Sequence, residues 1–331
     1  MTTDGVRLVV CGASGVWDEL VAADSRATPF HDWSFLRDIA ARSGWRFRPL
    51  LAVADGHPVG VVPVLSLRRI PMTPPLPFPY LGPLVPSQHL RGTLSVLRRW
   101  QVRHAHLLFR AAFSPQQPPP PAESDPGLEV DVEPTYVLDL SHGDESTYLS
   151  GLHSDRRAAL RRAARSGITT RPSLPGEALA VLPQVMQRSF ERHDAEAPRS
   201  VTAIAEYLDE RMGSDGRLIV ETVLEHEQPV GLLVGVRHGD RAYGWVGGTL
   251  PESLRTGAST AAYDAVIRRA LHDGVLSFDF YGHVDAGVGR FKASFGAEQQ
   301  PFWTLRSSLV PRRLAVLRRR STWRRPGGRV Q

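Results

Sequence analysis

Lysine is almost absent from this chain. Of its 40 basic residues, Lys292 is the single lysine and the other 39 are arginine. Replacement of lysine by arginine on this scale fits a GC-rich genome and needs no chemical reason, whereas the one position that kept lysine invites one. A guanidinium is a broad planar fork, and an ammonium is a compact point charge on a thin stem. Lys292 is therefore a candidate for a narrow, preorganised site, with drift as the alternative.

Cysteine and long apolar runs are scarce too. Cys11 is the one cysteine, which excludes an internal disulfide and a cysteine-based zinc cluster. No apolar run reaches the roughly 18 residues that a membrane-spanning helix needs, and residues 1–15 lack the apolar core of a secretory signal. With 42% hydrophobic and 22% charged residues over 331 positions, the composition predicts a cytoplasmic globular protein without a membrane span. His104 and His106 form no metal-ligand spacing, so no metal is expected.

Acidic residues are missing from residues 306–331. This segment holds nine arginines and carries +9, so the net charge of +6 leaves 6 − 9 = −3 for residues 1–305. A terminal basic run is typical of a polyphosphate-binding arm, with a solvated or disordered tail as the alternative. The tail residues that we take as candidate phosphate ligands are Arg312, Arg313, Arg318, Arg319 and Arg320.

Two segments of the chain resemble one another. Residues 50–62 and 220–233 each predict a strand, a tight turn and a second strand that begins with Pro-Val-Gly. The two Pro-Val-Gly runs start at Pro58 and Pro229, 229 − 58 = 171 positions apart. An amphipathic helix is predicted before each hairpin. Near-equal halves with the same order favour a tandem duplication.

A proline-rich loop separates the two halves, because Pro118 to Pro121 fit neither a helix nor a central strand. We therefore predict an N-terminal domain at residues 1–135, a second domain at 136–305 and an Arg-rich tail at 306–331. In the second domain the sequence predicts a strand at 136–140, a helix from Ser154 or Asp155 to Gly167 and a three-strand meander at 218–224, 230–237 and 242–247. A helix that opens at Ser259 or Thr260 and stops at Gly274 and a strand at 275–280 are predicted to follow. That order is the order of the GNAT acyltransferase fold, in which two adjacent strands splay apart and admit the acyl carbonyl. Here those strands are residues 243–248 and 278–282.

Several motifs together resemble the FemAB-type double-GNAT superfamily. They are the arginine-rich helix 156–167, Phe-Asp-Phe-Tyr-Gly at 278–282 and Gly-Arg-Phe-Lys-Ala-Ser-Phe-Gly at 289–296, with Trp17 and the segments 30–33 and 59–64 in the first half. The resemblance spans nearly the whole chain. It implies an α/β (α+β) fold of tandem GNAT-like domains, each with a mixed, mostly antiparallel sheet flanked by helices.

The resemblance also implies two chemistries. Fem-type members transfer an aminoacyl group from aminoacyl-tRNA to an amine, and other members are taken to use acyl-CoA. In the Fem group a Phe-Lys pair lies against the tRNA 3′ end and the reacting ester, which assigns these roles to Phe291 and Lys292. A fixed cation stabilises the oxyanion of ester aminolysis, and an aromatic ring can stack on a base. Asp279 is a candidate base, with a structural carboxylate as the alternative.

Further residues are candidates for binding. Arg157, Arg161 and Arg165 share one helix face at i, i+4 and i+8 and are candidates to hold phosphates, although a solvated face is the alternative. Around the two splayed strands, the candidates for substrate binding are Tyr243, Trp245, Tyr281, His283 and Arg290.

The sequence thus predicts an aminoacyltransferase that forms an amide or peptide bond. Aminoacyl-tRNA is its expected co-substrate, a small amine or peptide of natural-product biosynthesis its acceptor, and no cofactor is expected. The alternatives are an acyl-CoA-dependent N-acyltransferase and a non-catalytic RNA-binding relative. Residues 254–259 contain one glycine in the wrong register for the pyrophosphate loop of CoA-binding GNAT proteins, which disfavours CoA. The sequence makes no prediction of the oligomeric state.

Overall fold

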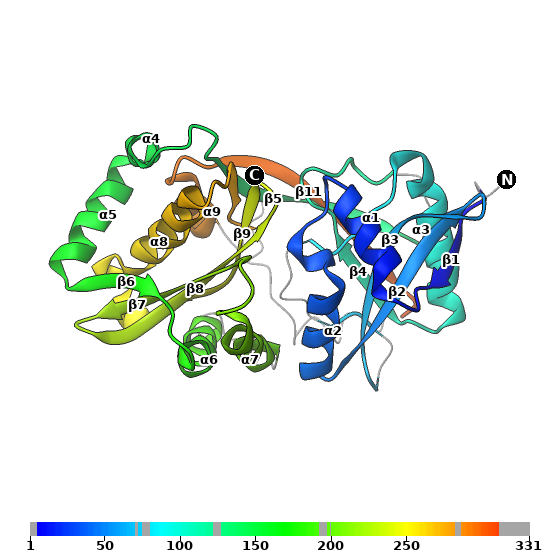
Figure 1. Cartoon of the computed structure of the whole chain (residues 1–331), viewed down its shortest axis with the longest axis horizontal. Helices are drawn as coiled ribbons and strands as arrows, with labels where there is room; N and C mark the ends of the chain where they lie inside the picture. The colour runs from blue at the N-terminus through cyan, green and yellow to red at the C-terminus, as the bar shows by residue number, and fades with distance from the viewer. Residues whose placement is uncertain are drawn as a thin grey trace, which may run out of the picture. The chain divides into compact units, whose positions relative to one another are not determined.

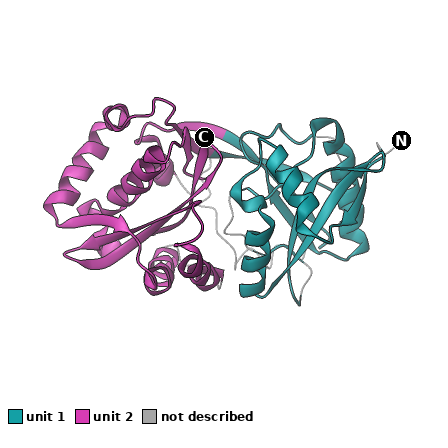
Figure 2. Ribbon diagram, in the orientation of Figure 1, with its two compact units in different colours: residues 1–134, 301–318 teal, residues 135–300, 319–331 magenta. Residues whose placement is uncertain are grey.

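The computed structural model describes residues 5–69, 72–74, 80–121, 127–191, 197–198, 200–281 and 286–310. These residues fall into two compact units, which Figure 2 colours separately. The first unit holds residues up to Pro134 together with the described residues from Pro301 onward, and the second holds Thr135–Gln300. No helix in the described ranges is both long and apolar enough to cross a membrane.

The first unit is built around a three-stranded antiparallel sheet in the order β1-β2-β3. Strand β4 pairs antiparallel with residues 304–308 of β11 in the same unit. Strands β5 and β11 each run from one unit into the other along the chain. The elements are β1 Arg7–Val10, α1 Ser14–Ala23, η1 Pro29–His31, α2 Trp33–Arg42, β2 Trp45–Ala54, β3 His57–Leu67, α3 Ser87–Arg103, β4 Leu108–Ala112, β5 Glu129–Asp139 and β11 Glu298–Ser308 (Figure 1).

Local sequence explains the helices of this unit. Asp32 caps α2, because its carboxylate accepts a hydrogen bond of 2.8 Å from the Phe35 N–H. Helix α3 buries Leu90, Leu94 and Leu97 in one core cluster with residues of β2 and β3. Residues alternate across a strand, so the opposite face of the sheet receives the aromatic packing of α1 and α2.

The second unit contains an antiparallel run β6-β7-β8-β9, with β10 added parallel to β9 and antiparallel to β5. Figure 1 shows α5 and α8 on one face of this sheet and α6 and α7 on the other. The elements are α4 Glu145–Gly151, α5 Ser154–Arg165, β6 Ile168–Pro172, α6 Glu177–Glu191, α7 Ser200–Arg211, β7 Leu218–Glu225, β8 Gln228–His238, β9 Arg241–Thr249, η2 Pro251–Thr256, α8 Ala258–His272, β10 Ser277–Asp279 and α9 Ala286–Ala293.

The two repeated hairpins share one irregularity. The pairing of β2 with β3 shifts register between Ala52 and Val53, and that of β7 with β8 shifts between Val223 and Leu224. The shifts are 223 − 52 = 171 positions apart, the same offset as the two Pro-Val-Gly runs. Each valine of Pro-Val-Gly is thus the extra residue of a β-bulge. A shared bulge at a shared offset supports the predicted duplication.

Glycine at the end of the first Pro-Val-Gly allows a close backbone approach. A Cβ on Gly60 would lie 2.1 Å from the Leu84 carbonyl oxygen, beside the two backbone hydrogen bonds that join Val61 to Leu84. We expect Gly60→Ala to lower the free energy of unfolding by about 3 kcal/mol, the upper range for overpacking a core. Urea denaturation would measure the loss. Gly12→Ala is the control, because a Cβ there meets nothing within 4 Å, and equal stability of the two variants would contradict the prediction.

Candidate active site

Lys292 lies near the C-terminal end of α9 and is buried, with 5% of its surface exposed. Its Nζ donates hydrogen bonds to the main-chain carbonyl oxygens of Phe280, at 2.9 Å, and of Tyr281. Both carbonyls directly follow β10. The single lysine of the chain is therefore fixed at the point where this strand ends, and its ammonium does not point into bulk solvent.

The parallel pairing of β9 with β10 ends at this point, and β10 is shorter than the strand predicted at residues 278–282. Strand β10 pairs with β9 through three residue pairs, of which the last is Asp279 with Tyr243. Strand β9 continues to Thr249 along β8, and its register with β8 shifts so that Trp245 is the extra residue of a bulge. The parallel ladder thus ends beside the lysine, and β9 runs on without β10.

A carboxylate braces the turn that carries these carbonyls. Tyr281 has a left-handed backbone with φ of 49°, which is uncommon for a residue with a Cβ. Asp279, 4% exposed, accepts hydrogen bonds from the Tyr281 N–H at 2.7 Å and from the Thr135 hydroxyl at 2.6 Å. The Asp279 carboxylate therefore holds the strained residue in place and places a negative charge near Lys292.

Burial dominates the electrostatics of the lysine. Loss of hydration disfavours a charged amine, and burial lowers the pKa of Lys292 to about 8, while the nearby Asp279 carboxylate acts in the opposite direction. Most of the Lys292 side chains are therefore still ammonium at neutral pH. The site can supply a positive charge that loses its proton in the mildly alkaline range.

Phe291 packs among protein groups beside the lysine. Its ring centroid lies 5.5 Å from that of Tyr263 and 5.2 Å from that of Phe295, both in edge-on contact. The Arg156 guanidinium carbon lies 5.0 Å from the Phe291 centroid, within cation–π range. Phe291 is thus partly buried at the margin of the core. Its stacking on a base of tRNA stays a prediction.

The structure brings only some of the predicted substrate-binding residues near the lysine. Tyr281 is partly buried and offers its carbonyl to Lys292, and Tyr243 stands opposite Asp279 in the ladder. Tyr243 is fully buried, which raises the pKa of its hydroxyl. Trp245 is 6% exposed and meets Tyr207 edge-on. Arg290 is exposed on α9, and His283 lies outside the described residues.

The predicted phosphate ligands divide into two groups. Arg157, Arg161 and Arg165 are exposed on α5, and none of the three forms an ion pair with a described carboxylate. Arg157 donates to the carbonyls of Ser150 and Leu152. The tail candidates lie outside the described residues: Arg312, Arg313, Arg318, Arg319 and Arg320.

Arg156 is the arginine of α5 that turns inward. It is partly buried, and its Nη1 donates to the Thr260 hydroxyl at 3.0 Å in the first turn of α8. Burial lowers the pKa of its guanidinium. Ala159 and Ala163, three and seven residues further on, are buried, and residues at this spacing share a helix face. An arginine on that face points towards the protein.

The start of α8 is tightly packed against α5. Gly257 has φ of 93°, and a Cβ there would lie 2.5 Å from the Ala159 carbonyl oxygen. The first hydroxyls of the helix are bonded within the protein, since Ser259 meets the Thr249 hydroxyl at 2.6 Å and Thr260 accepts from Arg156. This helix start therefore differs from an open, glycine-rich phosphate loop. Among the described residues, no group of three histidine, cysteine or acidic side chains forms a metal site.

Comparisons with known proteins find one matching domain family and several solved structures with a similar fold. Residues 153–293 match the family model of the acetyltransferase (GNAT) domain. Among solved structures, FemX has a TM-score of 0.63 at 13% identity, with 90% of this chain and 96% of that chain covered. A tandem GNAT protein from the clavulanic acid biosynthesis pathway has a TM-score of 0.58 at 15% identity and covers 92% and 99%. L-PGS from Bacillus licheniformis has a TM-score of 0.55 at 12% identity and covers 95% and 98%.

A comparison with curated protein sequences finds no match. At identities this low the structural similarity shows the fold alone, and the family model covers residues 153–293, which is less than half of the chain. The predicted fold class and the resemblance on which it rested are confirmed at this level. Residues 153–293 thus match the acetyltransferase (GNAT) domain, and the chain as a whole shares the fold of FemX and of the tandem GNAT protein.

Proposed function

We propose that this protein is an aminoacyltransferase that forms an amide bond between an aminoacyl group delivered by tRNA and the amine of a small molecule or peptide. The observation that carries the proposal is the buried ammonium of Lys292, fixed where β9 and β10 part. The position lies inside the segment that matches the GNAT domain model. Lysine is retained here in a chain that otherwise uses arginine.

Aminolysis of the aminoacyl ester needs one positive charge held at a fixed position. The acceptor amine attacks the ester carbonyl, a C–N bond forms, and the carbonyl oxygen becomes an oxyanion. The C–O bond to the ribose then breaks, and the proton from the amine passes to the leaving ribose oxygen. Hydrogen bonds to the carbonyls of Phe280 and Tyr281 hold the Lys292 ammonium in place beforehand, so that it stabilises the oxyanion without reorganisation.

Asp279 fits a positioning role in this scheme. Its Oδ1 is occupied by the Thr135 hydroxyl and the Tyr281 N–H, and both contacts brace the turn whose carbonyls hold Lys292. We therefore propose that Asp279 acts through the lysine and the turn. The structural alternative that the sequence left open for this carboxylate is thus the one we favour over a general base.

The charge on α5 supports tRNA as the donor. Arg157, Arg161 and Arg165 are exposed and form no ion pair with a described acid. A long polyanion gains more from such a row than a single CoA does, because every neutralised phosphate releases counterions. The closed packing around Gly257 also disfavours a pyrophosphate loop at the start of α8.

Acyl-CoA transfer is the second candidate. The matched family model is described as an acetyltransferase domain, and the tandem GNAT structure from the clavulanic acid pathway is named with reference to AcCoA. Both candidates place the acyl carbonyl between the diverging strands and differ in the carrier of the acyl group.

A donor screen separates the candidates. We expect the full chain to add an aminoacyl mass to an amine acceptor pool when it is supplied with total charged tRNA, and to lose this activity when the tRNA is deacylated beforehand. Mass spectrometry of the acceptor pool would identify the residue that is added. Transfer from acetyl-CoA without any need for tRNA would reject the proposal in favour of the second candidate.

A further inference from the structure

Helix α3 of the first unit presents an arginine face. Its sequence from Ser87 to Arg103 contains no acidic residue. Leu90, Leu94 and Leu97 fill the core, and this leaves the arginines on the outer side. Arg99 and Arg103 are exposed one turn apart, and Arg98 is partly buried beside them.

A second set of basic residues adjoins the end of this helix. Arg48 of β2 lies with its guanidinium carbon 5.9 Å from the ring of Trp100, and His104 stacks on the same ring with centroids 4.5 Å apart. Arg46 precedes Arg48 by two residues in β2 and so shares its face of the strand. Together these residues define the α3 basic face: Arg46, Arg48, Arg99, Arg103 and His104.

The charge of the α3 basic face is not compensated within the part of the chain that the structure describes. Elsewhere exposed arginines meet acids, as Arg188 meets Glu252 at 3.0 Å and Arg110 meets Glu133 at 3.6 Å. None of the four arginines of the α3 basic face forms such an ion pair with a described carboxylate. Like charges gathered without counter-charges raise the free energy of the free protein, and a polyanion bound to them lowers it.

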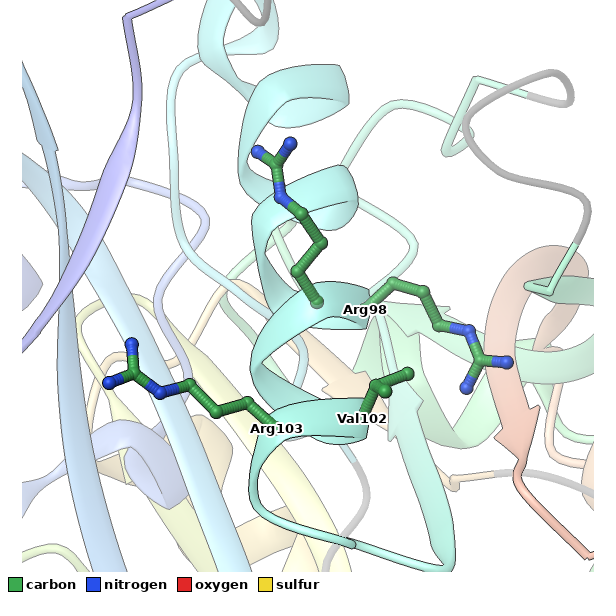
Figure 3. Close-up of a pocket in the computed structure, with 4 residues that line it drawn as sticks. Arg98, Val102 and Arg103 are labelled. Atoms are coloured by element: carbon green, nitrogen blue, oxygen red, sulfur yellow. The ribbon is translucent and has the colours of Figure 1, made fainter.

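The outer side of α3 is shallow and open rather than deeply hollowed. A shallow hollow of about 400 Å³ is lined by Arg98, Arg99, Val102 and Arg103. Figure 3 shows the labelled side chains of Arg98 and Arg103 extending in different directions from the last turns of the helix, with the short Val102 between them. Charged groups around a small apolar floor suit a convex, charged ligand such as a nucleic-acid backbone.

From this we infer that the α3 basic face binds the phosphate backbone of duplex RNA, namely the double-stranded body of the tRNA donor. The inference rests on the proposed function for the identity of the RNA, and it adds a binding surface on a different unit from Lys292. Arginine suits phosphate because its guanidinium donates two parallel hydrogen bonds.

The side chains of the α3 basic face favour one class of polyanion over the others. Single-stranded RNA is bound by stacking of its bases on open aromatic rings, but Trp100 already has Arg48 and His104 against it. An anionic membrane surface is bound by basic helices that also insert large apolar side chains. The one large hydrophobic side chain exposed on α3 is Val102, at 56%. Charge is therefore the main means of binding, which is how duplex backbones are held without regard to sequence.

The test compares two double variants of the full chain. Arg99→Ala/Arg103→Ala removes two charges from the α3 basic face, and Arg7→Ala/Arg37→Ala removes two exposed charges elsewhere in the same unit. Fluorescence anisotropy with a short RNA duplex, measured over a range of salt concentrations, gives the affinity and its salt dependence. We expect the first variant to bind about tenfold more weakly, with a log–log salt slope smaller by about 2. The second should bind as wild type.

Kinetics separate this inference from the proposed function. With aminoacyl-tRNA, Arg99→Ala/Arg103→Ala should raise KM about tenfold and leave kcat unchanged, whereas a charged 3′-terminal fragment without a duplex should react equally well with variant and wild type. Equal duplex affinity of the two double variants would overturn the inference, as would a loss confined to binding of phosphatidylglycerol vesicles. Failure of the wild type to use any charged tRNA would instead reject the proposed function.

Discussion

Replacing Lys292 with methionine should lower the rate of transfer by about 100–1000-fold, the usual loss when one group that stabilises an oxyanion is removed. Methionine has nearly the length of lysine and suits a buried position, but it carries neither charge nor donor. The fold should survive, since the neighbouring rings of Phe291 and Phe295 remain. The measurement is kcat with charged tRNA, beside the melting temperature of the same preparation.

A matched change tests whether charge alone is enough. Arg keeps a permanent positive charge at position 292, but its planar fork is wider than an ammonium and cannot bond the carbonyls of Phe280 and Tyr281 in the same way. We expect Lys292→Arg to recover little activity. Methionine leaves both carbonyls without their donor, which costs about 1–3 kcal/mol per buried unsatisfied group, so a measurable loss of stability is also expected for that variant. Full activity of the Arg variant would mean that lysine at this position is drift.

Transfer should also slow as the pH rises above about 8, the pKa to which burial lowers the ammonium of Lys292. Above that pH each further unit removes about nine-tenths of the remaining charged form, so the rate should fall about tenfold per unit. Stability should change in the opposite direction. Between about pH 8 and 10.5 the unfolded chain binds more protons at this residue than the native one, so the free energy of unfolding rises with pH in this window. Below pH 8 both states are protonated and the contribution is constant.

The neighbouring carboxylate provides the control. Asp279→Asn keeps an oxygen that can accept from Tyr281 and Thr135, but it removes the negative charge that opposes the effect of burial on Lys292. The alkaline limb of the pH–rate profile should therefore move to lower pH, with the fold preserved. A pH–rate profile of the wild type that stays level up to pH 10 would remove Lys292 from the catalytic scheme.

The sequence predicted the outline of the second unit well, because its signals there are local. The helix predicted from Ser154 or Asp155 to Gly167 is α5, Ser154–Arg165, and the helix predicted to stop at Gly274 is α8. Glycine stops act within one turn, whereas the predicted capping residues do not cap: the N-caps are His153 for α5 and Gly257 for α8, neither with a side-chain capping bond. Composition alone also singled out Lys292, because it is the one lysine of the chain.

Other features depend on distant parts of the chain and could not be predicted. The strand predicted at residues 136–140 begins at Glu129, since its first part pairs in the first unit, where Arg306 of β11 meets Asp131 and Glu133. The strand predicted at 275–280 is shorter, Ser277–Asp279, because the chain leaves β9 to form the turn that Lys292 holds. Neither outcome has a signal in the local sequence.

The arginines of α5 show the same limit at the scale of side chains. Spacing alone placed Arg157, Arg161 and Arg165 on a common face, and that face is exposed. Which arginine would turn inward was decided by contacts with Thr260 and Phe291, which lie more than a hundred residues away in the sequence. Helical spacing predicts which side chains share a face of the helix. Only the tertiary packing decides which of these faces contacts the rest of the protein.

The scarcity of lysine has a practical consequence for chemical labelling. Apart from the α-amino group, the chain offers one primary amine to acylating reagents such as activated esters. That amine is enclosed and hydrogen-bonded, so brief treatment should modify the terminus first. The slower rate of acylation at Lys292, followed by intact-mass spectrometry, would then report how often the enclosing turn opens.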